Sequence, residues 1–248
     1  MLRLRSLIFT AVLFASSIIG AALVLALFWA PFRMKWAVVV AWAHTCLWAG
    51  EFFCGLRVIT EGAENIPDEP CVFLIKHTTA MEAYWQIAAL PPSTWVLKRE
   101  LLWVPIFGWA LSLAMNSIAI DRRAGGPAVK QVIEQGKQRL SDGLSVCIFP
   151  EGTRMPPGET RRYGVSGAAL AREAGCPVVP VAHNAGDLWP RRSWRKHAGT
   201  IRFCIGPPID PAGRRPKETN LLAQEWVETK MGEISSLYKE RAILDSES

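Results

Sequence analysis

The sequence predicts an α/β protein in which a mixed, mostly parallel sheet is flanked by helices, with apolar membrane-associated segments at the N-terminus. Short apolar runs typical of buried strands alternate with longer segments that carry helix start and stop residues. Before them, residues 7–29 contain no charged side chain and are long enough to cross a bilayer. A chain of 248 residues can hold one sizeable α/β domain with a buried core and an appendage.

The first apolar segment, residues 7–29, is interpreted as an uncleaved membrane anchor. It is longer than the apolar core of a signal peptide, no small-x-small cleavage site follows, and Pro31 ends it. The second apolar segment, residues 36–50, is short for a span, and its spaced tryptophans suit an interfacial helix. Cations flank the first segment on both sides, so two arrangements stay open: a single span, or a helical hairpin sunk into one leaflet.

The composition favours a membrane protein with an anionic partner. Half of the residues are apolar, eleven are tryptophan, and the net charge is +6. A basic protein often binds nucleic acid, but no nucleic-acid motif is present, so an anionic lipid surface or a phosphorylated substrate fits better. The six cysteines are scattered without a C-x2-C pair, which predicts small core residues in a reducing compartment and neither disulfides nor zinc ligands.

The globular part opens at residue 57 in our prediction, which divides the chain into membrane-anchoring helices over 1–56 and an α/β domain over 57–248. Apolar runs predict strands at residues 71–75, 94–97, 117–120, 144–149, 178–182 and 200–205. Capping and breaking residues predict helices at residues 79–90, 105–114, 127–140, 165–174 and 219–241. In the last of these, apolar residues recur at near-helical spacing, as in an amphipathic surface helix.

A histidine follows the predicted strand 71–75 directly, where α/β proteins place their chemistry. His77 has Glu82 five positions further on, and a carboxylate can fix the tautomer of a histidine that acts as a general base. Residues five apart lie about 140° apart on an ideal helix, so the pair can meet only across a turn or a strand-to-helix junction. Taken alone, such a histidine is more often a structural, hydrogen-bonded residue.

A second polar stretch follows the predicted strand 144–149. Pro150 stops the sheet ladder, Gly152 allows a tight backbone path, and Arg154 offers a planar fork suited to a phosphate or a carboxylate. Two strand ends with polar residues therefore mark one candidate site.

These two stretches resemble the signature of the glycerolipid acyltransferases, H-x4-D followed by F-P-E-G-T-R. The second motif matches in full at residues 149–154, whereas the first reads H-x4-E because Glu82 replaces the usual Asp. Between them, residues 98–108 follow the pattern K-x-E-L-x3-P-x2-G and residues 118–122 the pattern I-x-I-x-R. Residues 178–181 match a V-V-P-V strand, while Asn116 stands where a glycine is common.

The resemblance implies a function and a mechanism. It implies transfer of an acyl chain from acyl-CoA or acyl carrier protein to the free sn-2 hydroxyl of lysophosphatidate, making phosphatidate in phospholipid biosynthesis. His77 would be the general base, Glu82 would orient it, and the hydroxyl would attack the thioester directly, with no acyl-enzyme. The resemblance also implies that further residues contact or shape the substrate site: Lys98, Arg122, Glu151, Gly152, Thr153 and Arg154.

Of the two membrane arrangements, the same resemblance favours the helical hairpin. It implies that the protein contacts membrane lipids on the cytoplasmic face of the cell inner membrane. We expect no metal, and no cofactor beyond the thioester cosubstrate. His183 and His197 are predicted to be structural or surface groups. The basic, tryptophan-containing stretch 191–196 fits either a lipid surface or the phosphates of coenzyme A.

Two alternative functions stay open from the residues. The acceptor could be glycerol 3-phosphate, another lysophospholipid or a lyso-aminolipid, because one sequence does not define the acceptor pocket. The chain could also be a catalytically silent, basic membrane-binding module that kept the fold, for which Glu82 is the single supporting residue.

Overall fold

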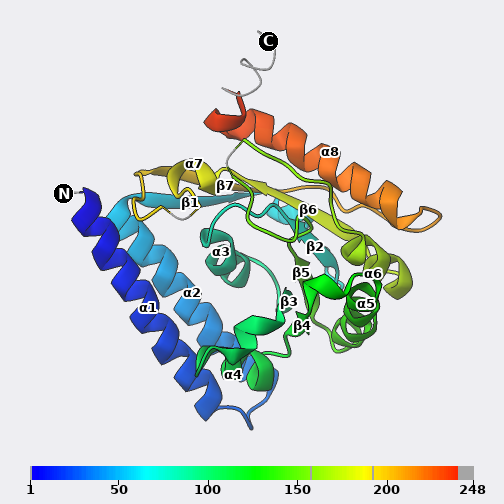
Figure 1. Ribbon diagram of the computed structural model, residues 1–248, viewed down its shortest axis with the longest axis horizontal. Helices are drawn as coiled ribbons and strands as arrows, with labels where there is room; N and C mark the ends of the chain where they lie inside the picture. Colours follow the sequence, from blue (N-terminus) through cyan, green and yellow to red (C-terminus); the bar gives the residue numbers. More distant parts are fainter. Residues whose placement is uncertain (1, 157, 192, 240–248) are drawn as a thin grey trace.

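The computed structural model describes residues 2–156, 158–191 and 193–239, and its centre is a seven-stranded sheet in the order β1-β7-β6-β2-β5-β3-β4 (Figure 1). β6 pairs antiparallel with β7, and the other strand pairs in the sheet are parallel. The predicted mixed, mostly parallel sheet is confirmed. The strands are β1 (Leu56–Glu61), β2 (Val72–Ile75), β3 (Ser93–Lys98), β4 (Ile118–Ile120), β5 (Ser145–Ile148), β6 (Val178–His183) and β7 (Gly199–Ile205).

Helices cover both faces of this sheet. Alternate residues of β2 enter different hydrophobic clusters: Phe73 and Ile75 pack toward α1, α2 and α3, whereas Val72 and Leu74 pack toward α5 and α6. Burial on both faces explains why the strands read as continuous apolar runs without polar alternation. The helices are α1 (Leu2–Ala26), α2 (Phe32–Cys54), α3 (Met81–Ala89), α4 (Phe107–Trp109), α5 (Gly126–Ser141), α6 (Ser166–Ala174), α7 (Ala185–Leu188) and α8 (Pro216–Ile234).

The first two helices form a hairpin that packs lengthwise along the globular part, at the left of Figure 1. Phe9 of α1 and Trp36 of α2 belong to the same buried cluster as Phe73 of the sheet, and Trp36 stacks on Trp95 with ring centroids 6.0 Å apart. Both helices are long and apolar enough to cross a membrane by length and composition. In each, less than a third of the most apolar window is buried inside the protein, 22% and 28%.

The second helix is longer than the predicted segment 36–50. Charged residues near its two ends, Arg33, Lys35 and Glu51, delimited the prediction, but α2 runs through them with 23 residues. Gly55 ends it in the left-handed conformation with φ 68°, and its N–H donates to the Glu51 carbonyl at 2.8 Å. The prediction of a short interfacial helix is therefore wrong, because the second segment is a long helix that forms a hairpin with the first.

Two other predicted helices differ in extent. The segment 105–114 is the short helix α4 followed by a π-helical turn, because Ile106 has a positive φ of 65° that breaks a continuous helix. The last helix, α8, begins at Pro216 and ends at Ile234, where Ser235 is extended. The predicted C-terminal residue of that helix, Arg241, lies outside the described residues. The short helix α7 was not predicted, since four residues carry no periodic signal.

Candidate active site

Four parallel strands deliver polar residues to one edge of the sheet. β2 lies between β6 and β5, β3 lies next to β5, and all four run in the same direction. His77 follows β2, the segment 149–154 follows β5, Lys98 ends β3 and His183 ends β6. Because the carboxyl ends of parallel strands meet at the same edge, these residues converge on one site.

The structure brings His77 and Glu82 together across the strand-to-helix junction that their spacing requires. Glu82 lies in the first turn of α3, and its Oε2 is 2.5 Å from Nδ1 of His77. The imidazole of His77 also stacks on Phe149, with ring centroids 3.9 Å apart and planes inclined by 17°. The stacking on Phe149 and the contact at Nδ1 thus fix the orientation of the ring. Among the described residues, no other hydrogen bond to this ring is found.

Glu82 is completely buried, and donors surround its second oxygen. The backbone N–H groups of Thr78 and Thr79 donate to Oε1 at 2.6 Å and 2.5 Å, and Nε2 of His183 lies 3.3 Å from the same atom. Burial alone raises the pKa of this carboxyl, but the imidazoles of His77 and His183 and the hydrogen bonds hold it below its usual value. Glu82 is therefore ionised at neutral pH and can fix a proton on Nδ1 of His77.

His183 has a role at this site that sequence reasoning missed. Its Nδ1 accepts the backbone N–H of Ala185 at 3.3 Å, so the proton sits on Nε2, which donates to the carbonyl of Lys76 at 2.8 Å. Burial lowers the pKa of His183 despite the nearby carboxylate of Glu82, which keeps the ring neutral. The signal available in the sequence was its position at the end of a strand, at the same edge as His77.

A buried ion pair supports His77 from behind. Nζ of Lys76 lies 2.7 Å from Glu151 and 2.9 Å from Glu228 of α8, and the other oxygen of Glu151 accepts the backbone N–H of His77 at 2.8 Å. Burial raises the pKa of Glu151 to about 7, although Lys76 opposes this shift. Glu151, which the resemblance placed in the acceptor pocket, is 3% exposed and holds the backbone at His77.

The loop after β5 is tied to the strand end that carries His77. Gly152 adopts a left-handed conformation with φ 71°, and its N–H donates to the carbonyl of Phe149 at 3.0 Å, which closes a tight turn. The N–H of Met155 donates to the carbonyl of His77 at 2.7 Å. Thr153 is partly buried in this turn, and the exposed Arg154 is left beside the histidine.

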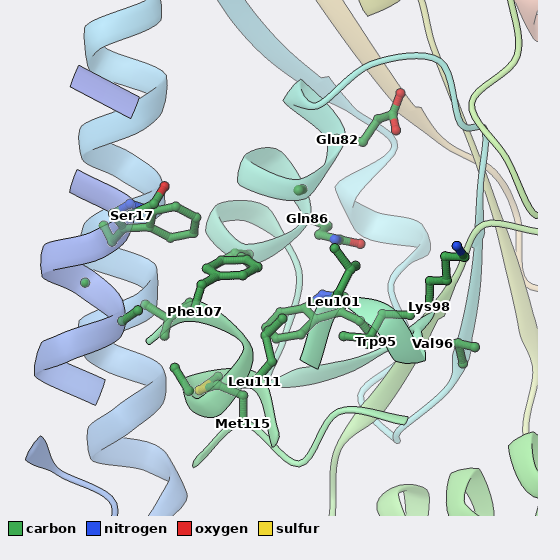
Figure 2. Close-up of a pocket in the computed structure, with 18 of the residues that line it drawn as sticks. Ser17, Glu82, Gln86, Trp95, Val96, Lys98, Leu101, Phe107, Leu111 and Met115 are labelled. Carbon is green, nitrogen blue, oxygen red and sulfur yellow. The ribbon is translucent and has the colours of Figure 1, made fainter. Parts of the chain in front are cut away.

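An apolar cavity of about 240 Å³ opens beside His77. Figure 2 shows it enclosed by residues from several elements, among them Gln86 of α3, Trp95 of β3 and Leu111, with Ser17 of α1 on the opposite side. Its charged lining residues are Glu82, Lys98 and Arg154 together with the imidazole of His77.

Of two cations predicted at the site, the structure describes the side chain of Lys98 but only the backbone of Arg122. Lys98 is half-exposed, lines the cavity and pairs with Glu100 at 2.9 Å. The backbone of Arg122 begins a short 3-10 turn after β4, and its side chain lies outside the described part of the structure. Among the described residues, no group of three or more His, Cys, Asp and Glu side chains could hold a metal ion.

The fold and the site place a histidine, held by a buried carboxylate, beside an apolar cavity at the carboxyl ends of parallel strands. A family model described as Acyltransferase matches residues 57–184. The chain is 44% identical over 211 residues to the 1-acyl-sn-glycerol-3-phosphate acyltransferase of Pseudomonas aeruginosa, covering 84% of this chain and 82% of that protein. The chain belongs to the acyltransferase family, and the predicted resemblance is confirmed.

More distant relatives agree with this assignment. The 1-acyl-sn-glycerol-3-phosphate acyltransferase alpha of Homo sapiens is 30% identical over 176 residues, which cover 70% of this chain and 62% of the human protein, less than two thirds of its length. The crystal structure of the 1-acyl-sn-glycerophosphate acyltransferase from Thermotoga maritima matches with a TM-score of 0.77. That match covers 93% of this chain and 94% of the other at 23% identity, so it supports the fold.

Proposed function

We propose that this protein transfers an acyl chain from an acyl thioester to the sn-2 hydroxyl of lysophosphatidate and so makes phosphatidate for phospholipid biosynthesis. The observation that carries the proposal is His77, held by the ionised Glu82 and lining an apolar cavity beside the cations Lys98 and Arg154. The substrate follows the name of the relative that is 44% identical.

In the proposed mechanism, His77 acts as general base through Nε2, because Nδ1 is held by Glu82. Nε2 takes the proton of the acceptor hydroxyl while the oxygen attacks the thioester carbonyl. The tetrahedral intermediate then expels the thiolate, which takes the proton back from His77 as a thiol. The products are an ester and a free thiol, and no acyl-enzyme is formed.

The apolar cavity receives the acyl chain of the donor, acyl-CoA or acyl carrier protein. Lys98 and Arg154 are accessible at the same site and offer cationic hydrogen bonds to the phosphate of the acceptor or to the developing oxyanion. We assign Arg122, Gly152 and Thr153 to the acceptor side of the site because their positions match the family motifs. No metal or resident cofactor takes part in this scheme.

We also propose that the hairpin lies in one leaflet of the inner membrane, on the cytoplasmic side. Near the start of α1, Phe9 packs edge to face on Trp189, and the far end of the same helix contacts α4. The globular part therefore covers the inner side of the hairpin along its length, so a bilayer can reach only its outer side. Large apolar side chains are exposed on the hairpin and on the adjoining segment 101–113, including Phe14, Ile18, Leu23, Trp48, Phe52, Trp103, Trp109 and Leu113.

The test is acyl transfer by the purified protein in detergent, with labelled palmitoyl-CoA and three acceptors in parallel: lysophosphatidate, glycerol 3-phosphate and lysophosphatidylcholine. We expect labelled phosphatidate from lysophosphatidate alone, and a loss of about a thousandfold in His77→Ala. Transfer to another acceptor would keep the mechanism and change the substrate. If no acceptor is labelled, even with acyl carrier protein as donor, the chain is a silent membrane-binding module.

The binding role of Arg154 is tested in the same assay. Arg154→Ala should raise the KM for lysophosphatidate about tenfold and change kcat less, because the guanidinium binds the phosphate in both the ground state and the transition state. An unchanged KM would argue against a phosphate at this position.

A further inference from the structure

A second cavity, of about 490 Å³, lies next to the first. Ser17, Thr79 and Arg154 line both cavities, so the two meet close to the site of His77. α1 lines the second cavity with apolar and hydroxyl side chains, Leu13 and Phe14 among them. From the segment 189–196, tryptophans and the cations Arg191 and Lys196 line it.

The second cavity is cationic. Arg154, Arg191 and Lys196 line it, and none of the described residues that line it is acidic. Nη1 of Arg191 donates to the backbone carbonyl of Arg154 at 2.8 Å, which joins the segment 189–196 to the loop after β5. This hydrogen bond holds Arg191 next to Arg154, which adjoins the active site, whereas Lys196 lines the part of the cavity near Thr10 of α1.

Lys196 is a buried cation without an acidic partner in the described part of the chain. It is 2% exposed, and its Nζ donates to Thr10 of α1 at 2.6 Å and lies 5.0 Å from the ring centroid of Trp189. No carboxylate of the described residues lies within 4.0 Å of it. Burial lowers the pKa of Lys196, so an anion in the cavity would offset the cost of keeping this charge buried.

We propose that this second cavity binds the phosphate monoester of the acceptor through Lys196 and Arg191, with Arg154 shared between the two cavities. The acyl chain of the same lysophosphatidate lies against Leu13 and Phe14 of α1. This inference rests on the proposed function and deepens it: the donor chain and the acceptor occupy separate cavities that meet close to His77. An amphiphilic anion fits a cavity that both apolar and cationic side chains line.

The phosphates of coenzyme A have the same chemistry as the acceptor phosphate, so the experiment separates the two sources. The variants are Lys196→Met, which removes the charge and keeps an apolar stem between the rings of Phe9 and Trp189, and Arg191→Gln. Lys217→Met, an exposed lysine on α8, is the matched control. For each, KM is measured for lysophosphatidate and for palmitoyl-CoA, together with equilibrium binding of labelled lysophosphatidate to the protein in detergent.

We expect Lys196→Met and Arg191→Gln to weaken lysophosphatidate binding and to raise its KM about tenfold, with the KM for palmitoyl-CoA changed by less than about twofold. The turnover ratio of lysophosphatidate to monoacylglycerol, an acceptor without phosphate, should fall about tenfold in the same variants. Lys196→Arg should restore binding because it keeps the positive charge.

Two results would overturn the assignment. A raised KM for palmitoyl-CoA with unchanged lysophosphatidate binding would give the cavity to the donor. Unchanged values for both substrates would make Lys196 an anchor for α1 alone. Should Lys196→Met fail to fold, as judged by size exclusion and thermal melting, Arg191→Gln decides, because the Arg191 side chain is exposed to the cavity and donates a hydrogen bond to a loop carbonyl. If the wild type transfers to no acceptor, the proposed function fails, while the binding measurement still tests this cavity.

Discussion

Two buried carboxylates flank His77, and their surroundings shift their pKa values in opposite directions. Glu82 contacts the ring nitrogen of His77 and the backbone N–H groups of Thr78 and Thr79, Nε2 of His183 lies 3.3 Å from it, and its pKa is lowered. Glu151 has the N–H of His77 and the ammonium group of Lys76, which it shares with Glu228, and its pKa is raised to about 7.

The difference between these carboxylates shows that burial alone does not decide the charge of a group. Both side chains lose hydration to a similar degree, since Glu82 is 0% and Glu151 3% exposed. The number of donors aimed at each carboxylate decides whether the ionised form is stable. Glu82 is therefore suited to orient a base, and Glu151 is suited to support the backbone beneath it.

Removing the first carboxylate is expected to have the largest effect. Glu82→Ala should reduce kcat/KM for lysophosphatidate about a thousandfold, because His77 loses the group that fixes its tautomer and several buried N–H groups lose their acceptor. Glu82→Asp should retain much of the activity, since a carboxylate remains. Membrane association of both variants serves as the folding control, and an Ala variant with full activity would remove Glu82 from the mechanism.

The contribution of His183 to the surroundings of Glu82 can be tested separately. His183→Ala should lower kcat about tenfold, because the ring that packs 3.3 Å from Glu82 is removed and the carbonyl of Lys76, next to His77, loses its donor. Removing this ring raises the pKa of Glu82, so activity should disappear at a higher pH on acidification than in the wild type. His183→Gln, which can again donate a hydrogen bond, should restore part of the rate. A variant with reduced stability but an unchanged pH profile would show that His183 only packs.

The smallest effect is expected when the second carboxylate, Glu151, is replaced by an amide. Glu151→Gln should change kcat by less than about threefold, since the amide keeps the shape and the wild-type group takes up a proton near neutral pH. Because its pKa is raised in the folded state, the wild type binds an extra proton between the unfolded value near 4.5 and about 7. The free energy of unfolding of the wild type minus that of the variant should therefore fall by about 3 kcal/mol as the pH rises through this window. Denaturation in detergent at several pH values would measure it, and a difference that rises with pH would contradict the assignment.

Much of the site could be predicted because its central residues lie close together in the sequence. The strand before His77, the turn to Glu82 and the turn at Gly152 depend on local patterns of apolar runs and on proline and glycine. Lys76 carried no such signal. Its side chain is completely buried and pairs with Glu228 of α8, which lies 152 residues away in the sequence.

The sequence by itself determined the elements of the sheet, the two apolar N-terminal helices and the motif residues at the strand ends. Only the tertiary structure decided that β6 lies beside β2, which places His183 at Glu82, and that α1 folds back to form walls of both cavities. The physical reason is that periodicity reports which face of an element is buried, whereas the partner that buries it depends on strand order and helix packing across the whole chain.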